Sequence, residues 1–370
     1  MSNRLKILCF HPALAPYRVD LFNILSEFSD LTVVFLQENL QTQLLDQGRI
    51  RDQARFRYRF ALRGFTIKGR IFRFGLNQYI RDIKPDVVIG FEFSPVMVLL
   101  CLSRLLLGGC HFKLWTTTDD RAEQARTTNG LRKVFRNWIL RHVNGCIVTD
   151  ATVATVMREC VNGIDKVSFA AVPIVHDTAH IRTQAPTVIA AGRCWRESLA
   201  LTKRDRLLLF VGRLVPVKNL TWLISQIALI SPNVHLVIVG DGIEEALLKE
   251  TSLKLGIVDR VKFLGRKEGC ELYTIMSAVD ALVLCSHSEA YGAVVAEALQ
   301  WGTPCIVNDR CGASVLINNS NGRVFRYNDG SDFESKLNEV FLIGKAGESL
   351  LPVDLRESVV NLVKKMYENA

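Results

Sequence analysis

Residues 286–308 have the sequence SHSEAYGAVVAEALQWGTPCIVN, and this stretch decides the fold class. The apolar run Ala281–Cys285 precedes it and has the length and composition of a buried strand. Residues 293–301 predict a helix rich in Ala and Leu, which Gly302 ends at a C-cap position. The next apolar run, Cys305–Val307, predicts another strand. The order strand, loop, helix, strand is typical of a parallel α/β sheet.

The loop before this helix carries the first candidate site. Ligands of open α/β sheets bind outside the carboxyl ends of the strands, and residues 286–292 lie at such an end. The N–H groups of residues 292–294 would open the helix and attract an anion. Glu289 lies in the loop and Glu297 in the apolar helix, where a carboxylate needs a partner. Two interpretations stay open: both acids bind sugar or ribose hydroxyls, or Glu297 pairs with a cation and Glu289 is a solvated loop acid.

A second loop has the sequence FVGRLVPVKNL over Phe210–Leu220, between a predicted strand and a predicted helix. Arg213 and Lys218 lie in this loop. Arg binds phosphate through two N–H groups and Lys acts as a point charge, so the pair suits a diphosphate. Either cation alone would be interpreted as a surface residue, and the two nearby acids favour the functional interpretation.

Two further strand ends add weaker signals. The run Val239–Gly242 is a tight glycine turn without a complete G-x-G-x-x-G motif. Gly240 and Gly242 are therefore predicted to serve the backbone conformation of the turn. Val261–Arg266 is the next strand and loop along the chain.

Glu-x7-Glu followed by Ala-Leu-x-x-Gly-Thr-Pro resembles the donor-site signature of retaining glycosyltransferases of family 4, also called glycosyl transferases group 1. The likeness covers nearly all of residues 207–330 and extends less firmly over the first half. It implies the α/β GT-B fold, with two Rossmann-like doubly wound domains facing a central cleft. It also implies a nucleotide sugar in the second domain, an acceptor in the first, and a last helix that crosses back to the first.

The resemblance assigns roles to individual residues. Arg213 and Lys218 would hold the donor diphosphate and stabilise the charge that grows as it leaves. Glu289 would bind the transferred sugar and Glu297 the ribose, and backbone groups near Arg266 would meet the nucleobase. The donor-binding residues implied are Gly212, Arg213, Lys218, Gly240, Arg266, Glu289, Tyr291, Gly292, Ala293, Val294 and Glu297. The catalytic residues implied are Arg213, Lys218, Glu289 and Asp119.

The first half departs from the family pattern at two places. Asp119-Asp120 stands where many relatives have a His near the reacting sugar. These acids are interpreted either as groups that orient the sugar or acceptor, or as a helix N-cap before Arg121. The first loop has Ala-Pro-Tyr-Arg in place of the usual Gly-Gly pair. Tyr17 and Arg18 are therefore candidate acceptor-binding residues, the alternative being a loop that only Pro16 anchors.

Further expectations concern cofactors and the location of the protein in the cell. Cations and a helix N-terminus can replace a metal on the diphosphate, so we expect a metal-independent enzyme without a cofactor. Ten cysteines without a C-x-x-C pair predict buried, reduced thiols in a cytoplasmic protein. Residues 1–20 lack a signal peptide pattern, and the apolar stretch over residues 96–107 is too short to span a bilayer.

The net charge of +9 is unevenly distributed. Residues 49–84 hold 11 basic and 2 acidic residues, interleaved with aromatic side chains. Such a segment suits an anionic membrane surface or nucleic acid, and the plain alternative is a solvated face with core aromatics. No nucleic-acid motif accompanies the charge, so peripheral docking on the inner face of the membrane is favoured.

The whole chain is thus divided into residues 1–190, an acceptor-binding domain, 191–350, a nucleotide-sugar-binding domain, and 351–370, a closing helix. The expected function is transfer of a sugar from a nucleotide-diphosphate sugar to a glycan or lipid-linked acceptor in polysaccharide biosynthesis. A nucleotide-sugar epimerase and a non-catalytic nucleotide-sugar-binding subunit are the alternatives.

Overall fold

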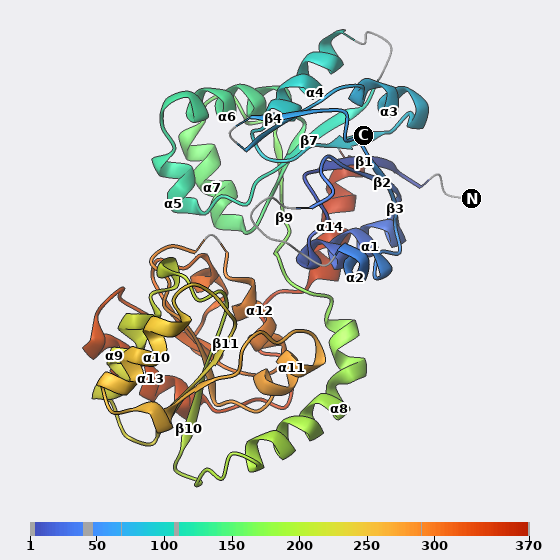
Figure 1. The fold of residues 1–370 in the computed structure, drawn as a ribbon. Coiled ribbons are helices and arrows are strands. Elements are labelled where there is room, and N and C mark those ends of the chain that lie inside the picture. Colours follow the sequence, from blue (N-terminus) through green and yellow to red (C-terminus); the bar gives the residue numbers. More distant parts are fainter. Residues whose placement is uncertain (1–3, 40–46, 68, 107–110, 290, 369–370) are drawn as a thin grey trace. The chain divides into compact units, whose positions relative to one another are not determined.

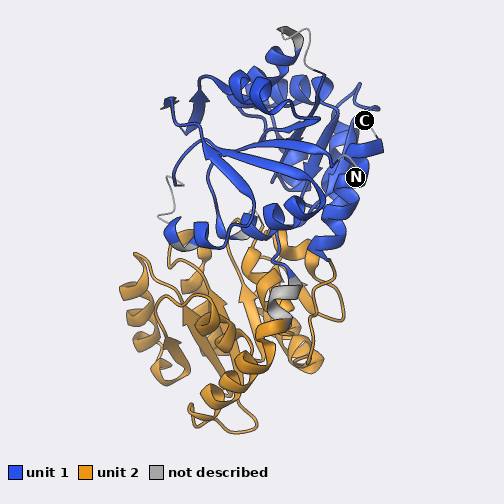
Figure 2. Ribbon diagram, turned by 90° about the vertical axis from the view of Figure 1, so that its right-hand side faces the viewer, with its two compact units in different colours: residues 1–177, 354–370 blue, residues 178–353 orange. Residues whose placement is uncertain are grey.

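The computed structural model describes residues 4–39, 47–67, 69–106, 111–289 and 291–368. The chain forms two compact units, which Figure 2 colours separately. Unit 1 comprises Met1–Asp177 with Asp354–Ala370, and unit 2 comprises Thr178–Val353. The division expected after residue 190 is wrong in position, because it falls inside helix α8 (Thr178–Glu197). Pro186 and the small residues around it hide this helix in the sequence, although Gly192 lets it pack closely on Ser277.

Unit 1 contains a parallel sheet with the order β3-β2-β1-β6-β7-β8-β9 in its described part. Its strands are β1 (Lys6–His11), β2 (Asp30–Phe35), β3 (Arg57–Phe60), β6 (Val87–Ile89), β7 (Lys113–Thr117), β8 (Gly145–Val148) and β9 (Ser168–Ala171). Central strands such as β6 are fully buried, as continuous apolar runs predict for parallel sheets. The strand order reverses between β1 and β6, so their carboxyl ends form a topological switch point.

The helices of unit 1 include one from the far end of the chain. They are α1 (Pro16–Phe28), α2 (Gln47–Asp52), α3 (Leu76–Ile83), α4 (Pro95–Leu106), α5 (Ala122–Thr127), α6 (Gly130–His142), α7 (Ala151–Cys160) and α14 (Leu355–Glu368). Helix α14 packs on α1 and β9 (Figure 1). The Tyr367 hydroxyl accepts a hydrogen bond from the Leu5 N–H, and the Lys365 ammonium donates to the Phe169 carbonyl. Deep burial of its apolar stripe, which includes Leu362, fixes α14 in unit 1.

Unit 2 contains a second parallel sheet with the order β12-β11-β10-β13-β14-β15 in its described part. The strands are β10 (Arg206–Val211), β11 (Val234–Val239), β12 (Val261–Phe263), β13 (Ala281–Leu284), β14 (Cys305–Asn308) and β15 (Gly322–Phe325). The order reverses between β10 and β13. Strand β10 leads into the loop that holds Arg213 and Lys218, called the cation loop, and β13 leads into the loop over residues 286–292 that holds Glu289, called the acidic loop. The sheet thus brings both loops to one switch point.

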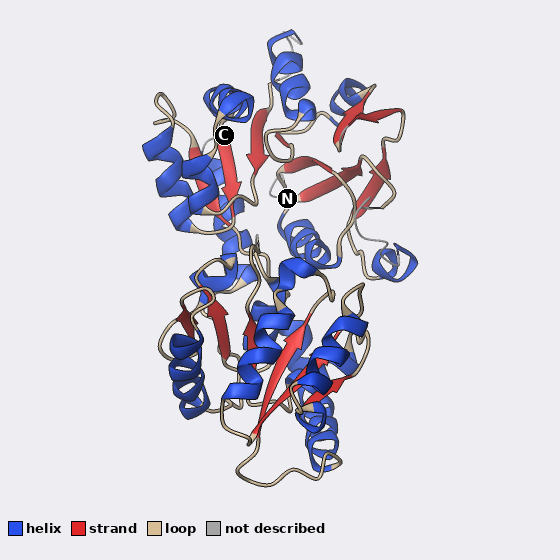
Figure 3. Cartoon of the chain, turned by 60° about the vertical axis from the view of Figure 1, so that its left-hand side comes forward, coloured by secondary structure: helices blue, strands red, loops and turns tan. Residues whose placement is uncertain are grey.

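Helices cover both faces of this second sheet (Figure 3). Besides α8 they are α9 (Leu220–Leu229), α10 (Glu245–Lys254), α11 (Cys270–Met276), α12 (Ala293–Gln300) and α13 (Gly330–Ile343), with single 3₁₀ turns η1 (Pro216–Lys218), η2 (Val258–Arg260) and η3 (Gly312–Leu316). Helix α8 packs on α11, so the stretch around the expected division after residue 190 is part of unit 2.

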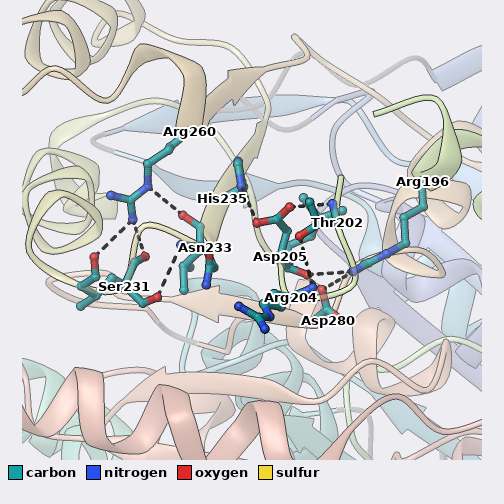
Figure 4. Close-up of polar contacts among 12 residues, drawn as sticks. Arg196, Thr202, Arg204, Asp205, Ser231, Asn233, His235, Arg260 and Asp280 are labelled. Atoms are coloured by element: carbon teal, nitrogen blue, oxygen red, sulfur yellow. Dashed lines mark hydrogen bonds and ion pairs between the residues drawn. The ribbon is translucent and has the colours of Figure 1, made fainter. Parts of the chain in front are cut away.

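Polar side chains tie together the amino ends of the unit 2 strands (Figure 4). Asp280 accepts hydrogen bonds from the Arg196 guanidinium at 2.9 Å and from the Leu207 N–H at 2.7 Å. Asp205 contacts His235 at 3.5 Å, which joins β10 to β11. Arg260 donates to the Ser231 carbonyl at 2.8 Å. These contacts link the amino ends of β10, β11 and β13 to one another and to α8.

Two expectations about the whole chain concern thiols and membranes. Of the nine described cysteines, all are free and six are buried. Burial raises the pKa of Cys9 to about 12, which keeps it a thiol. Cys194 and Cys270 are exposed, so the expectation of buried thiols is wrong for these two. No helix in the described ranges is long and apolar enough to cross a membrane.

Candidate functional site

The loop after β10 is held by its own backbone and by a neighbouring strand. The Leu214 N–H donates to the Asp241 carbonyl at 2.7 Å, and the Leu214 side chain is fully buried. This anchor leaves Arg213 exposed on one side and sends the chain through the 3₁₀ turn η1 to Lys218. The guanidinium of Arg213 has no ion-pair partner among the described residues, so it is available to a ligand.

Lys218 and Glu289 meet across the switch point. The Lys218 ammonium donates to a carboxylate oxygen of Glu289, and the two side chains are 16% and 20% exposed. The Glu289 backbone is fixed as well, because its carbonyl accepts from the Gly312 N–H at 2.9 Å. The structure therefore brings together the acid of one loop and the cation of the other. The interpretation of Glu289 as a solvated loop acid is wrong, since it has a partner and limited exposure.

Glycines let three loops approach one another at this edge. Gly240 has φ 140°, a conformation that L side chains rarely adopt, and a Cβ there would overlap the Gly212 carbonyl oxygen. The Gly240 N–H donates to the Gly265 carbonyl at 2.9 Å, which links the ends of β11 and β12. The predicted backbone role of Gly240 agrees with this packing. Arg266 follows, and its guanidinium pairs with Glu268, so its side chain already has a carboxylate partner.

The N-terminus of α12 lies beside Glu289. Gly292 caps the helix with φ 81°, and a Cβ on it would crowd the Leu284 side chain. Ala293 and Val294 begin the helix, and their N–H groups belong to its first turn. Glu297 lies one turn on and is half-buried, as is Tyr291 before the helix. The predicted anion-attracting terminus is thus adjacent to the ion pair, whereas Ala290 lies outside the described residues.

Sequence reasoning missed Asn219, which braces this site. Asn219 is 9% exposed and adopts a left-handed conformation with φ 60°. Its amide donates to the Asn328 side chain at 2.9 Å and to the Cys285 carbonyl at 3.3 Å. Asn tolerates positive φ better than most residues, so an Asn directly before a predicted helix was the sequence signal that could have identified this position. Asn219 therefore positions the preceding Lys218.

A cavity of about 770 Å³ lies elsewhere in unit 2. It is lined by Arg193 and Arg196 of α8, by Asp280, and by the segment from Lys345 to Ser349. None of the predicted donor-binding residues lines it. This cavity and the converging polar loops are thus separate features.

In unit 1, Arg18 and Asp119 form an ion pair at the carboxyl edge of the sheet. One guanidinium nitrogen donates to both carboxylate oxygens of Asp119, at 2.7 and 2.8 Å. Arg18 is 8% exposed, which makes it part of the structure as well as a candidate ligand group. The sequence predicted both residues but not their contact. The side chain of Tyr17, the other acceptor candidate, lies outside the described part of the chain.

The neighbouring Asp120 has a structural partner. Its carboxylate accepts from Arg132 at 2.7 Å, and the residue is 7% exposed. The N-cap of α5 is Arg121, whose backbone N–H donates a hydrogen bond to the side-chain oxygen of Gln124 at 3.0 Å. The alternative of an aspartate N-cap before Arg121 is therefore wrong, because the capping position is one residue later.

Two further residues of this edge were missed. Glu92, after β6, has φ 46°, which is unusual for a residue other than glycine. The residue is exposed overall, yet desolvation of its carboxyl group and repulsion by Asp119 and Asp120 raise the pKa of Glu92. His11 ends β1, and burial together with the charge of Arg18 lowers the pKa of His11 to about 4. Such strained or shifted groups concentrate at functional sites.

Metal binding has no cluster to support it in the part of the chain described. Within the described ranges, no group of three or more His, Cys, Asp or Glu residues is arranged to hold a metal ion. Two ion pairs lie at these edges instead, Lys218 with Glu289 and Arg18 with Asp119.

Comparison with known proteins bears on the second unit first. Residues 193–350 match the family model described as glycosyl transferases group 1. A D-inositol 3-phosphate glycosyltransferase of Mycolicibacterium gilvum is 30% identical over 176 residues, which cover 46% of this chain and 39% of that protein. An uncharacterized glycosyltransferase of Methanocaldococcus jannaschii is 31% identical over 140 residues, covering 37% of this chain and 36% of that one. The chain thus spans well under half the length of both relatives.

Solved structures resemble the chain along nearly its whole length. HepE of Anabaena in complex with UDP covers 98% of this chain and 99% of its own, with a TM-score of 0.73 and 16% identity. The lipopolysaccharide outer core galactosyltransferase WaaB covers 99% of this chain and 98% of its own, with a TM-score of 0.65 and 18% identity. The shared architecture is two parallel-sheet, Rossmann-like units, which is the GT-B fold.

Proposed function

We propose that the protein is a retaining glycosyltransferase of family 4, and the match of residues 193–350 to the model of glycosyl transferases group 1 supports this proposal. It moves a sugar from a nucleotide-diphosphate sugar to a glycan or lipid-linked acceptor. One observation carries the proposal: the loops after β10 and β13 meet at the switch point of unit 2 through Lys218 and Glu289. Ligands of open α/β sheets bind at such points.

The donor site has the groups that a nucleotide-diphosphate sugar needs. Arg213 and the first turn of α12 offer N–H donors to the diphosphate. The missing side chain at Gly240 lets its backbone pack against Gly212, which keeps the ends of β10 and β11 close together at the proposed diphosphate site. Glu297, half-buried on α12, is the proposed ribose ligand. Tyr291 and the backbone near Arg266 complete the donor contacts.

The ion pair between Lys218 and Glu289 has a direct consequence for binding. Without donor, the two side chains neutralise each other. A diphosphate carries more charge than one carboxylate and competes for Lys218, while sugar hydroxyls donate to the Glu289 carboxylate that is released. Donor binding therefore replaces one internal contact by several external ones. Both side chains are positioned before the donor arrives, which reduces the ordering cost of binding.

During transfer, the bond between the anomeric carbon and the diphosphate oxygen breaks as the bond to the acceptor oxygen forms. Negative charge grows on the departing diphosphate, and Arg213 and Lys218 stabilise it. The acceptor hydroxyl proton passes to the leaving phosphate oxygen on the same face. Because these cations can do the work of a metal ion, we propose that transfer needs no metal or other cofactor. The rate of transfer should therefore be the same with and without EDTA.

The acceptor is proposed to bind at the carboxyl edge of the unit 1 sheet. Arg18 and Asp119 lie there as an ion pair, with Glu92 at the end of the neighbouring strand. Hydroxyl-rich acceptors suit such paired acids and bases, since carboxylates accept and guanidinium groups donate. Tyr17 stays a proposed acceptor ligand. Among the solved neighbours, one is titled a lipopolysaccharide outer core galactosyltransferase, which supports a lipid-linked glycan as the acceptor class to test first.

The proposal is tested by a thermal-shift panel of nucleotide sugars, starting with UDP-glucose because HepE has been solved with it. A ligand that binds only the folded state raises Tm, by an amount that grows with its concentration over Kd. We expect at least one nucleotide sugar to raise Tm more than its free sugar does. Absence of a shift with every nucleotide sugar would contradict the proposal.

Product analysis then separates the alternatives. Incubation of the donor with lipid-linked glycans should give a glycosylated acceptor of retained anomeric configuration. Conversion of the donor to another nucleotide sugar would identify an epimerase. Donor binding without any product would favour a non-catalytic binding subunit.

A further inference from the structure

A two-stranded antiparallel hairpin projects from the basic segment of unit 1. It consists of β4 (Gly64–Ile67), labelled in Figure 1, and β5 (Arg70–Arg73). Phe65 lies opposite Phe72 and Ile67 opposite Arg70. The Phe74 N–H donates to the Arg63 carbonyl at 3.0 Å, which extends this pairing by one position. The register therefore fixes which side chains share a face.

The inner face of the hairpin is attached to the core. Ile71 is 6% exposed and belongs to the hydrophobic core of unit 1. Arg73 is 8% exposed, and its guanidinium donates to the carbonyl oxygens of Leu36, Phe65 and Phe72 at 2.7, 2.9 and 2.8 Å. Desolvation lowers the pKa of Arg73. These bonds tie both strands of the hairpin to the end of β2, so the hairpin is a rigid element.

The outer face of the hairpin is apolar where water would favour polar side chains. We define the hairpin face by the side chains that alternate outward, namely Arg63, Phe65, Ile67, Arg70, Phe72 and Phe74. Phe65, Ile67 and Phe74 are 46%, 57% and 57% exposed. The Phe65 ring stacks on Phe72 at 5.1 Å and meets Phe74 at 5.8 Å. A hairpin with one face in the core normally presents a polar face to solvent.

Cations rim this apolar face. Arg63 and Arg70 are exposed, and among the described residues neither has a carboxylate partner. The surrounding segment, residues 49–84, holds 11 basic and 2 acidic residues. Aromatic and aliphatic side chains at the centre with arginines at the border suit the boundary between lipid headgroups and acyl chains.

We propose that the hairpin face docks the protein on an anionic lipid bilayer, with Phe65, Ile67 and Phe74 entering the headgroup region and Arg63 and Arg70 contacting lipid phosphates. In one respect this inference rests on the proposed function, because a lipid-linked acceptor gives the docking its use. Charge complementarity selects the anionic surface. The aliphatic Ile67 at the tip distinguishes a bilayer from single-stranded nucleic acid, which favours aromatic stacking platforms.

The remaining aromatics of the basic segment show why the hairpin face is distinct. Phe56 is 6% exposed and packs with Phe22 and Phe35, with ring centroids 5.3 and 6.5 Å apart. Tyr58 and Phe60 extend the same cluster along β3. The interpretation as core aromatics is therefore right for these residues, and the membrane interpretation applies to the hairpin face alone.

Flotation with vesicles of phosphatidylglycerol and phosphatidylcholine in equal parts, compared with pure phosphatidylcholine, tests the proposal. The full-length protein should float only with the anionic vesicles. The double variant Phe65→Ser/Ile67→Ser should weaken partitioning about tenfold, because two apolar side chains no longer leave water. The variant Arg63→Gln/Arg70→Gln should weaken it about fivefold for each charge removed.

A control uses two apolar residues of unit 2 that are even more exposed than Phe65 and Ile67. Ile243 is 84% and Leu342 87% exposed, and Ile243→Ser/Leu342→Ser should leave flotation unchanged. Thermal-shift binding of the nucleotide sugar should stay unchanged in the hairpin variants, which separates a docking defect from a failure of the donor site.

Three outcomes overturn the inference. One is equal flotation with neutral and anionic vesicles. Another is loss of flotation in the unit 2 control to the same degree as in the hairpin variants. The third is salt-dependent binding of a random oligonucleotide that Arg63→Gln/Arg70→Gln abolishes and Phe65→Ser/Ile67→Ser leaves intact, with no vesicle binding, which would assign the face to nucleic acid.

Discussion

At the residue scale, the contact between Lys218 and Glu289 shows how the fold prepares charged groups for a ligand. Neither side chain is fully buried, so the pair does not carry the full desolvation cost of a buried ion pair. Asn219 and the Gly312 N–H hold the two backbones from either side. The pair is therefore placed by the scaffold and remains open to exchange with a ligand.

Replacing Lys218 tests this exchange. Lys218→Ala should lower kcat/KM for transfer by about 100-fold or more, because a cation that stabilises the departing diphosphate is lost. The donor-induced rise in Tm should shrink in parallel.

The matched control is Lys249→Ala, which breaks an exposed pair with Glu245 on α10. That change should leave transfer intact and alter the free energy of unfolding by no more than about 0.5 kcal/mol. Full activity of Lys218→Ala, or an equal loss in both variants, would contradict the proposed role.

His11 makes stability depend on pH. Its folded pKa is about 4, lowered by burial first and by Arg18 second, while Asp119 and the Ala13 carbonyl act in the opposite direction. Between pH 6.5 and about 4 the unfolded imidazole binds a proton that the folded one does not. As the pH falls through this window, the free energy of unfolding should therefore decrease, by about 3 kcal/mol in total from this group.

Urea unfolding of the wild type and of His11→Asn at intervals from pH 7 to pH 4.5 measures this effect. The Asn amide can still donate to the Ala13 carbonyl, as the ring nitrogen does at 2.9 Å. The variant should show the smaller pH dependence, and parallel curves for the two proteins would refute the assignment to His11.

At the element scale, glycines decide whether the loops of unit 2 can meet. Gly240→Ala should destabilise the protein by about 3 kcal/mol, since backbone strain adds to the overlap with the Gly212 carbonyl. Donor binding should be lost with it, because the cation loop is displaced.

Gly256→Ala is the control for the strain alone. Gly256 has φ 67° and nothing within 4 Å of an added Cβ. Its replacement should cost only about 1 kcal/mol and leave donor binding intact. Thermal denaturation of both variants, with and without nucleotide sugar, measures their stability and donor binding. Equal losses in Gly240→Ala and Gly256→Ala would show that close contact between the loops is unimportant.

At the scale of the whole molecule, the chain returns to unit 1 for its last helix. Arg356 of α14 pairs with Glu27 at 2.6 Å, and Leu362 is 1% exposed. Leu362→Ala should therefore lower the free energy of unfolding by about 2–5 kcal/mol. The rate of amide hydrogen exchange should rise in unit 1, although α14 follows unit 2 directly in the sequence.

The exposed Lys364 on the same helix provides the control. Lys364→Ala should change stability by at most about 0.5 kcal/mol. Faster exchange confined to unit 2 in the Leu362→Ala variant would show that α14 does not stabilise unit 1.

The sequence by itself determined the parallel sheets and the loops at their carboxyl ends, because apolar runs, glycine turns and a helix stop are local signals. Arg213, Lys218, Glu289 and Gly240 were found in this way, each from its place after a strand. Helix α8 and the hairpin β4–β5 were not, since Pro186 and an apolar outer face contradict the patterns that identify such elements.

Only the tertiary structure decided which of these groups touch. Strand order, which no local pattern contains, brings Lys218 to Glu289 and Arg18 to Asp119. It also gives Glu92 and His11 the neighbours that shift their pKa values. Electrostatic interaction depends on distance in space and on burial, and both are properties of the folded chain.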